Sequence, residues 1–186
     1  MDTNILLFAL IIPLIGFLTN ILFGKSLGKS ISGILGTVTI VTSFVITVLL
    51  FFQIQETKEP IRINLFEWFS LENFKIDFAF YFDQLSILWL LFVTGIGSLI
   101  HLYSTSYMKD DENFHKFFAY LNLFIFFMMI LVTGSNLLMM FIGWEGVGLC
   151  SYLLIGFWHQ NQEYNDASKK AFIMNRVGDL GFLVGT

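Results

Sequence analysis

Residues 117–162 read FFAYLNLFIFFMMILVTGSNLLMMFIGWEGVGLCSYLLIGFWHQNQ, a run of 46 positions in which Glu145 is the one Asp, Glu, Lys or Arg residue. A bilayer core about 30 Å thick is crossed by roughly 20 helical residues, so this run is long enough to cross it twice. Gly134-Ser135-Asn136 lies near its middle, and these turn-forming residues predict a tight reversal. The stretch therefore predicts a helical membrane protein.

The remainder of the chain repeats this pattern of long uncharged segments. Residues 3–24, 30–55 and 84–108 contain no Asp, Glu, Lys or Arg, and each is long enough for one crossing. The last stretch follows Lys169-Lys170, and its sixteen residues to Thr186 are short for a crossing. We therefore expect an all-α polytopic membrane protein with five complete transmembrane helices and a truncated sixth, and hence an N-terminal fragment.

The composition agrees with a membrane location and excludes several functions. Of 186 residues, 56% are hydrophobic and 13% are charged, whereas soluble domains average about 25% charged residues. A net charge of −4 offers no basic patch, so no nucleic-acid partner is expected. Cys150 is the one cysteine, which excludes an internal disulfide and a cysteine metal cluster. We expect no cofactor and no metal on this chain, and the lipid bilayer around it.

Lysines near the ends of the uncharged segments predict the orientation in the membrane. They fall between alternate segments and should therefore share one side: Lys25, Lys29, Lys109, Lys116, Lys169 and Lys170. Short cytoplasmic loops are enriched in Lys and Arg, so this side is predicted to be cytoplasmic. The N-terminus is then extracytoplasmic.

The segment between the second and third crossings has the alternation of a β-hairpin. Apolar residues occupy every second position from Phe74 to Phe82, with Ala79 among the residues assigned to the opposite, polar face. Residues 61–65 alternate in the same way, and residues 70–73 connect the two runs. The alternative is an irregular amphipathic loop.

These patterns divide the chain into three parts. Residues 1–54 hold the first two transmembrane helices. Residues 55–84 form the loop with the hairpin, on the outer membrane surface. Residues 85–186 hold helices three to six.

Glu145 is the main functional candidate, because a carboxylate at the centre of a membrane helix costs roughly 2.5–3.5 kcal/mol on insertion scales. Its neighbours one turn away, Phe141, Ile142, Gly148 and Leu149, cannot neutralise it, so a partner must come from another helix. Burial favours the protonated acid and a nearby cation favours the ionised one, so such an acid can bind and release a proton. A purely structural buried acid is the alternative.

Small residues on the same helix indicate where a neighbouring helix packs. Gly143, Gly146 and Cys150 form a stripe roughly opposite Glu145, which would let another backbone approach closely. The helix carrying Glu145 should therefore lie inside a bundle.

Three further residues could take part in ion movement. Arg176 and Asp179 are spaced i, i+3 and can neutralise one another, either as a structural pair or as a charge-coupled switch. His101 titrates near physiological pH and could join a proton route. A hydrogen-bonding role for His101 at the membrane interface is favoured, and we expect the Trp residues to serve lipid contact and helix packing.

The run GWEGVGLCSYLLIGFW at 143–158 resembles the signature of the antiporter-like subunit of respiratory complex I, called subunit L in bacteria and subunit 5 in mitochondria. The residues FDQLS at 82–86 and LIHLYS at 99–104 resemble the third-helix region of that family. NRVGD at 175–179 resembles the start of its sixth helix.

The resemblance implies a proton-translocating subunit of an NADH:quinone oxidoreductase. Glu145 would pair with a lysine on the next-but-one helix, with Arg176 and Asp179 in the same charged network; this chain ends before that helix. FMN, iron–sulfur clusters and quinone chemistry would belong to partner subunits. Other partners would be membrane subunits of complex I, including homologous antiporter-like ones, and a bacterial inner membrane is favoured over a mitochondrial one.

Two rival functions stay open on the sequence. One is a subunit of a multi-subunit Na⁺/H⁺ antiporter or a membrane-bound hydrogenase, which share parts of the same signature. The other is a non-transporting structural membrane fragment, in which Glu145 is permanently neutral.

Overall fold

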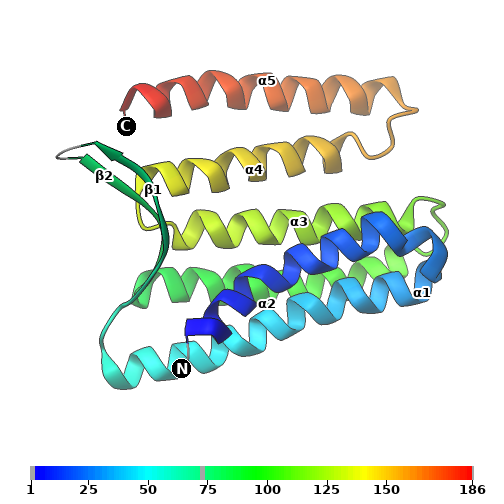
Figure 1. The fold of residues 1–186 in the computed structure, drawn as a ribbon. Coiled ribbons are helices and arrows are strands. Elements are labelled where there is room, and N and C mark those ends of the chain that lie inside the picture. Colours follow the sequence, from blue (N-terminus) through cyan, green and yellow to red (C-terminus); the bar gives the residue numbers. More distant parts are fainter. Residues whose placement is uncertain (1–2, 72–73, 186) are drawn as a thin grey trace.

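The computed structural model describes residues 3–71 and 74–185, which form a bundle of long helices with a two-stranded hairpin at one end (Figure 1). Its elements are α1 (Thr3–Thr57), β1 (Ile61–Leu71), β2 (Phe74–Phe82), α2 (Gln84–Tyr107), α3 (Phe114–Thr133), α4 (Leu137–Ile155) and α5 (Gln162–Gly185). The prediction of a mostly helical chain with a small hairpin is confirmed. Part of the predicted connection at 70–73, residues 72 and 73, lies outside the described residues.

Helix α1 is bent back on itself at Gly28 and forms two antiparallel legs (Figure 1). Gly28 has φ 81° and ψ 166°, a conformation that residues with a side chain rarely adopt. The Ser43 hydroxyl of the second leg donates a 2.9 Å hydrogen bond to the Ala9 carbonyl of the first. The two legs correspond to the first two predicted crossings.

In the part of the chain that the structure describes, four helices are long and apolar enough to cross a membrane. They are α1, with both its legs, α2, α3 and α4. Their lengths and composition support a multi-pass membrane protein.

Helix α5 begins earlier than the sequence predicts. Lys169 and Lys170 lie within the helix rather than before it, because Asn161 accepts a hydrogen bond from the Glu163 backbone at 3.0 Å and starts the helix there. Gln162 also donates to Asp166 one turn later, at 2.9 Å. The predicted sixteen-residue segment is thus the second part of a 24-residue helix.

The connections between helices separate into two groups at opposite ends of the bundle (Figure 1). One end holds the Gly28 bend, the α2–α3 connection and the α4–α5 connection. The lysines that predicted the orientation lie in these regions or next to them. The other end holds the hairpin, the α3–α4 turn and the N-terminus. The grouping matches the alternation that the lysines predicted.

Strands β1 and β2 pair antiparallel, with Ile61 opposite Phe82 and Ile63 opposite Phe80. Ile63, Phe80 and Phe82 are buried against the helices. Ala79, which the alternation assigned to the polar face, is fully buried as well. The reason is that the α3–α4 turn lies along β2: the Ser135 N–H donates to the Ala79 carbonyl at 3.2 Å.

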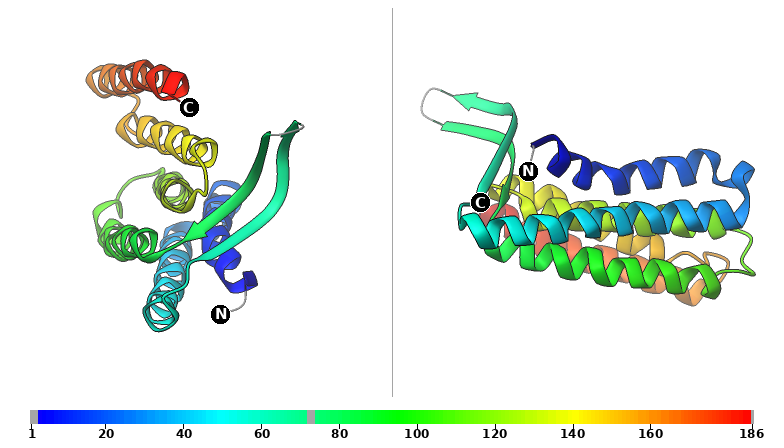
Figure 2. Two further views of the ribbon diagram at one scale, coloured as in Figure 1. Left: turned by 90° about the vertical axis from the view of Figure 1, so that its left-hand side faces the viewer. Right: turned by 90° about the horizontal axis from the view of Figure 1, so that it is seen from below.

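Helix α3 lies at the centre of the bundle, packed against both α1 and α4. The main core combines aliphatic side chains from every helix except α5, among them Leu10, Ile40, Leu90, Ile125 and Met139. Viewed end-on, α5 lies at the edge of the bundle beside α4 (Figure 2, left). The three charged candidates Glu145, Arg176 and Asp179 all lie on this α4–α5 pair.

Candidate functional site

Helix α4 is positioned by glycines that let α3 approach closely. A Cβ atom on Gly143 would meet the backbone of Leu131, and one on Gly146 would meet the ring of Phe127. Cys150, the third residue of this stripe, is fully buried. The predicted close approach of another helix is therefore confirmed, and it directs the opposite side of α4 toward α5.

Glu145 forms an ion pair across the two helices, because its Oε2 contacts Nη1 of Arg176 on α5. The same Arg176 nitrogen lies 3.5 Å from Oδ2 of Asp179, one turn further along α5. The three candidates that the sequence singled out thus form one cluster, which we call the α4–α5 charge cluster: Glu145, Arg176 and Asp179.

The members of the cluster differ in exposure, which separates their roles. The side chain of Asp179 is 7% exposed, that of Glu145 21% and that of Arg176 43%. The guanidinium carbon of Arg176 also lies 4.5 Å from the ring centroid of Phe172, a cation–π contact. The acids are therefore the enclosed members, and the arginine is the member with most freedom to move.

Trp144 adds a neutral donor that the sequence did not single out. Its indole Nε1 donates a 2.7 Å hydrogen bond to Oδ1 of Asp179. Trp144 is also 48% exposed, which agrees with the predicted lipid contact, so the hydrogen bond to Asp179 adds to that role. The available signal was that a Trp in an apolar segment needs a partner for its N–H, but the sequence does not say which one.

Two carboxylates and one guanidinium carry a formal charge of −1 when all three are ionised. Such a charge is costly in a membrane, and one bound proton removes it. Because Arg176 contacts both acids through one nitrogen, a small movement of its side chain changes which acid is neutralised. The cluster can therefore couple proton binding to the position of a cation.

His101 lies elsewhere, in the interior of the bundle on α2. It is 1% exposed, its Nδ1 lies 2.8 Å from the Gly97 carbonyl, and its Nε2 lies 3.4 Å from Nδ2 of Asn122 on α3. These contacts agree with the predicted hydrogen-bonding role of His101, and α3 covers this side of α2.

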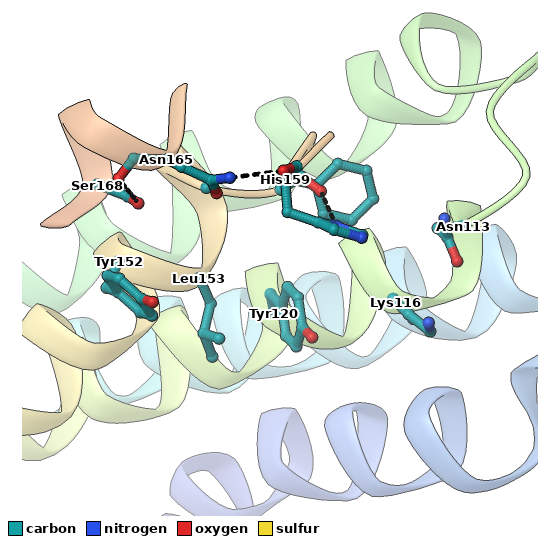
Figure 3. A pocket seen from close by; sticks show the side chains of 10 residues that line it. Asn113, Lys116, Tyr120, Tyr152, Leu153, His159, Asn165 and Ser168 are labelled. Carbon is teal, nitrogen blue, oxygen red and sulfur yellow. Dashed lines mark hydrogen bonds between the residues drawn. The ribbon is translucent and has the colours of Figure 1, made fainter. Parts of the chain in front are cut away.

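A hollow of about 230 Å³ opens between α3, α4 and α5 at the lysine-rich end (Figure 3). About half of its exposed lining is polar, and the side chains include Lys116, Tyr120, Tyr152 and Ser168. The Tyr152 ring lies 5.3 Å, centroid to centroid, from Phe172, the ring under Arg176. A chain of contacts thus connects this hollow with the charge cluster. Among residues 3–71 and 74–185, no group of three or more His, Cys, Asp or Glu side chains could hold a metal ion.

The fold is similar to that of chains in two solved complexes. It resembles a chain of the membrane-bound sulfane sulfur reductase, an archaeal respiratory membrane complex, with a TM-score of 0.84 at 20% identity over 98% of this chain and 36% of that one. It also resembles a chain of the Mrp complex from Dietzia sp., with a TM-score of 0.75 at 20% identity over 98% of this chain and 18% of that one.

Sequence comparison identifies the family. Residues 68–118 match the family described as NADH-ubiquinone oxidoreductase (complex I), chain 5 N-terminus, and residues 134–186 match NADH:quinone oxidoreductase/Mrp antiporter, TM. The chain belongs to the complex I chain 5 and subunit L family, as the resemblance had implied.

The named relatives are similar over nearly the whole chain. NADH-ubiquinone oxidoreductase chain 5 of Hypocrea jecorina is 45% identical over 95% of this chain, and that of Allomyces macrogynus is 46% identical over 94%. NADH-quinone oxidoreductase subunit L of Rickettsia bellii is 40% identical over 100%. The chain spans 25%, 28% and 29% of the lengths of these three relatives.

Proposed function

We propose that this chain is part of a proton-translocating membrane subunit of a complex I type NADH:quinone oxidoreductase. The observation that carries the proposal is the pairing of Glu145 with Arg176 across α4 and α5, with Asp179 on the same guanidinium. A helix pair of an antiporter-like fold therefore holds two acids that share one cation.

The proposed step is an exchange of Arg176 between the two acids. When Arg176 moves toward Asp179, Glu145 loses its cation and takes up a proton. When Arg176 returns to Glu145, the ionised form is favoured and the proton leaves. The exposed guanidinium and the enclosed acids support this order, because the cation has room to move and the acids do not.

The family resemblance implied that Glu145 pairs with a lysine on the next-but-one helix. Among the residues that the structure describes, the cation at Glu145 is Arg176 of α5, the next helix. We propose that Arg176 holds the charge of Glu145 in one state and that a further cation of the whole protein competes with it in another.

The redox chemistry is proposed to lie on partner subunits. NADH oxidation, FMN, the iron–sulfur clusters and the quinone would belong to them, and this chain would receive a conformational or electrostatic signal. Other membrane subunits, including homologous antiporter-like ones, are the proposed neighbours. The similar structures support this, because both belong to proteins named as complexes, one of them a respiratory membrane complex.

For topology, we propose five complete membrane crossings, two of them in α1, with α5 as the start of a sixth. We also propose that the N-terminus lies outside and that the lysine-rich end faces the cytoplasm. The named relatives come from fungi and from Rickettsia, so the bacterial inner membrane stays a prediction.

A subunit of an Mrp-type antiporter is the second candidate, because the description of the family matched by residues 134–186 names both kinds of protein. The match of residues 68–118 and the names of the relatives favour complex I. Genes for NADH- and quinone-binding subunits beside the gene of this chain would support the first candidate, and their replacement by antiporter subunits would support the second.

The proposed function is tested by Glu145→Gln in the full-length protein, assembled with its partner subunits. The substitution removes the titratable group with little change in volume. We expect NADH-driven proton translocation to fall at least tenfold while the complex still assembles. Glu163→Gln is the matched control, since Glu163 is exposed at the start of α5. If proton translocation and quinone reduction both continued at the wild-type rate and stoichiometry, the role assigned to Glu145 would be wrong.

A further inference from the structure

A second, larger hollow lies on the opposite side of the bundle from α5, between the second leg of α1 and the end of α2. Its volume is about 650 Å³, within the range of about 300–1,000 Å³ found for small-molecule sites. Most of its exposed lining is apolar, and the side chains include Ile34, Val38, Leu102 and Phe114. Ile34, Val38 and Leu102 are more than half exposed, so they form a groove open to the surroundings of the bundle.

Close helix packing forms the floor of this groove. A Cβ atom on Gly33 of α1 would lie 3.1 Å from the Phe114 ring of α3 and 3.5 Å from the methyl group of Thr105 on α2. Three helices therefore meet beneath the groove. The second leg of α1 begins after the Gly28 bend, close to the groove, and Lys29 is the first residue of this leg.

The lysine-rich end of the groove carries charged residues. Lys29, Lys109 and Asp110 line it there, and the Lys29 ammonium donates a 3.0 Å hydrogen bond to the Lys109 carbonyl. Lys29 also lines an adjoining hollow of about 490 Å³, together with Lys25, Lys116, His115 and Glu112. The two hollows thus meet at Lys29, with four lysines against the two acids among their lining residues.

A hydroxyl in the groove lacks a partner among the described residues. Thr37 lines the groove, and its Oγ1 is buried without a hydrogen bond. Thr42 and Thr47 in the same leg of α1 each donate to the carbonyl four residues earlier, at 2.8 Å. Thr37 thus lacks the hydrogen bond that these two threonines make, and its hydroxyl is a buried polar group without a partner beside the groove.

We propose that these two hollows bind one anionic phospholipid. Its phosphate would lie among Lys25, Lys29 and Lys116, and an acyl chain would follow Ile34, Val38 and Leu102. An apolar groove beneath a cluster of lysines has the two-part character of a phospholipid, and basic pockets between transmembrane helices bind anionic headgroups. The excess of lysines over acids favours a negatively charged lipid over a zwitterionic one.

This proposal requires a membrane location and does not depend on proton translocation. The groove and the charge cluster share no lining residue. A failure of either proposal would therefore leave the other standing.

The test uses the full-length protein assembled with its partner subunits in phosphatidylcholine vesicles. A trace of phosphatidylglycerol with a photoactivatable group in one acyl chain is added, and labelled peptides are identified by mass spectrometry. We expect labels within residues 33–38 and 102–105. The same photoactivatable group on phosphatidylcholine should label these peptides at least fivefold less.

Substitutions connect the labelling to the lysines. Lys25→Gln with Lys29→Gln should lower phosphatidylglycerol labelling of these peptides at least fivefold, and Lys25→Arg with Lys29→Arg should restore it. Lys169→Gln with Lys170→Gln is the matched control, because these lysines line neither hollow. Equal labelling by both lipids, unchanged labelling in the Gln variant, or no label in the groove because another protein segment covers it would each overturn the proposal.

Discussion

The indole nitrogen of Trp144 donates a 2.7 Å hydrogen bond to Asp179, the least exposed acid of the α4–α5 charge cluster. Trp144 is the residue before Glu145 in α4. One short segment of α4 therefore supplies one acid of the cluster, Glu145, and a hydrogen bond to the other, Asp179. The two oxygens of Asp179 thus have different partners, Trp144 on Oδ1 and Arg176 on Oδ2. Trp144 is a positioning residue, because its N–H contacts the acid and the indole itself is uncharged and does not titrate at neutral pH.

Replacement of Trp144 by Phe should keep the aromatic volume and remove the donor. A hydrogen bond to a charged group contributes about 1.5–3 kcal/mol, so we expect at least a tenfold loss of coupled proton translocation with assembly unchanged. NADH-driven proton uptake in vesicles, divided by the amount of assembled complex, measures this. Trp158→Phe is a matched control, since Trp158 donates to Asp111 at 2.8 Å outside the cluster. Equal effects of the two substitutions would contradict the prediction.

Asp179→Asn removes the charge of the enclosed acid and retains its shape. We expect coupled activity to fall several-fold without loss of assembly, because Arg176 then remains with Glu145 and the exchange stops. The amount of assembled complex on a native gel and the rate of NADH-driven proton translocation are both needed. Loss of the assembled complex would instead identify Asp179 as part of a structural ion pair.

Arg176→Gln leaves two acids without the cation between them. Breaking an enclosed ion pair by removing one partner leaves an uncompensated charge, and the proposed exchange between Glu145 and Asp179 loses its cation. We expect at least a tenfold loss of proton translocation, with part of it regained in Arg176→Lys. Lys170→Gln, an exposed cation on the same helix, serves as the control. Proton translocation at the wild-type level in Arg176→Gln would rule out the proposed exchange.

Gly146→Ala tests the packing that orients α4. A Cβ atom there would overlap the Phe127 ring, so either this ring or α4 itself must move. Overpacking of this kind typically costs about 1–3 kcal/mol, and we expect a lower thermal unfolding temperature and a weaker Glu145–Arg176 pairing. Gly148→Ala is the control on the same helix, because its nearest contact would be Asn175 Nδ2 at 3.7 Å. An equal unfolding temperature for the two variants would contradict the prediction.

The parts of the fold that were predictable are those that depend on local pattern. Charge spacing located the helical segments, since a bilayer demands a minimum apolar length. Alternation located the hairpin, although Ala79 is buried because the α3–α4 turn lies on it. The sequence predicted the start of the last helix after Lys170, because the charged residues before that point are typical of a loop. The structure begins α5 at Gln162, where Asn161 accepts a hydrogen bond from the Glu163 N–H.

The candidate site was predictable in its members and not in its contacts. Glu145, Arg176 and Asp179 were conspicuous because charges are rare in apolar segments. Nothing in the spacing indicated that Trp144 would bind Asp179, or that His101 would be covered by α3. Both depend on which helices are neighbours and how each is rotated about its axis.

The sequence alone determined where the chain can cross a membrane, which residues are costly there and which family it belongs to, because hydrophobic length and residue identity are local properties. The tertiary structure decided that Arg176 serves both acids and that Trp144 holds one of them. The physical reason is the rotation of α4 about its axis. Gly143 and Gly146 pack α4 against α3, and this orientation turns Glu145 toward α5.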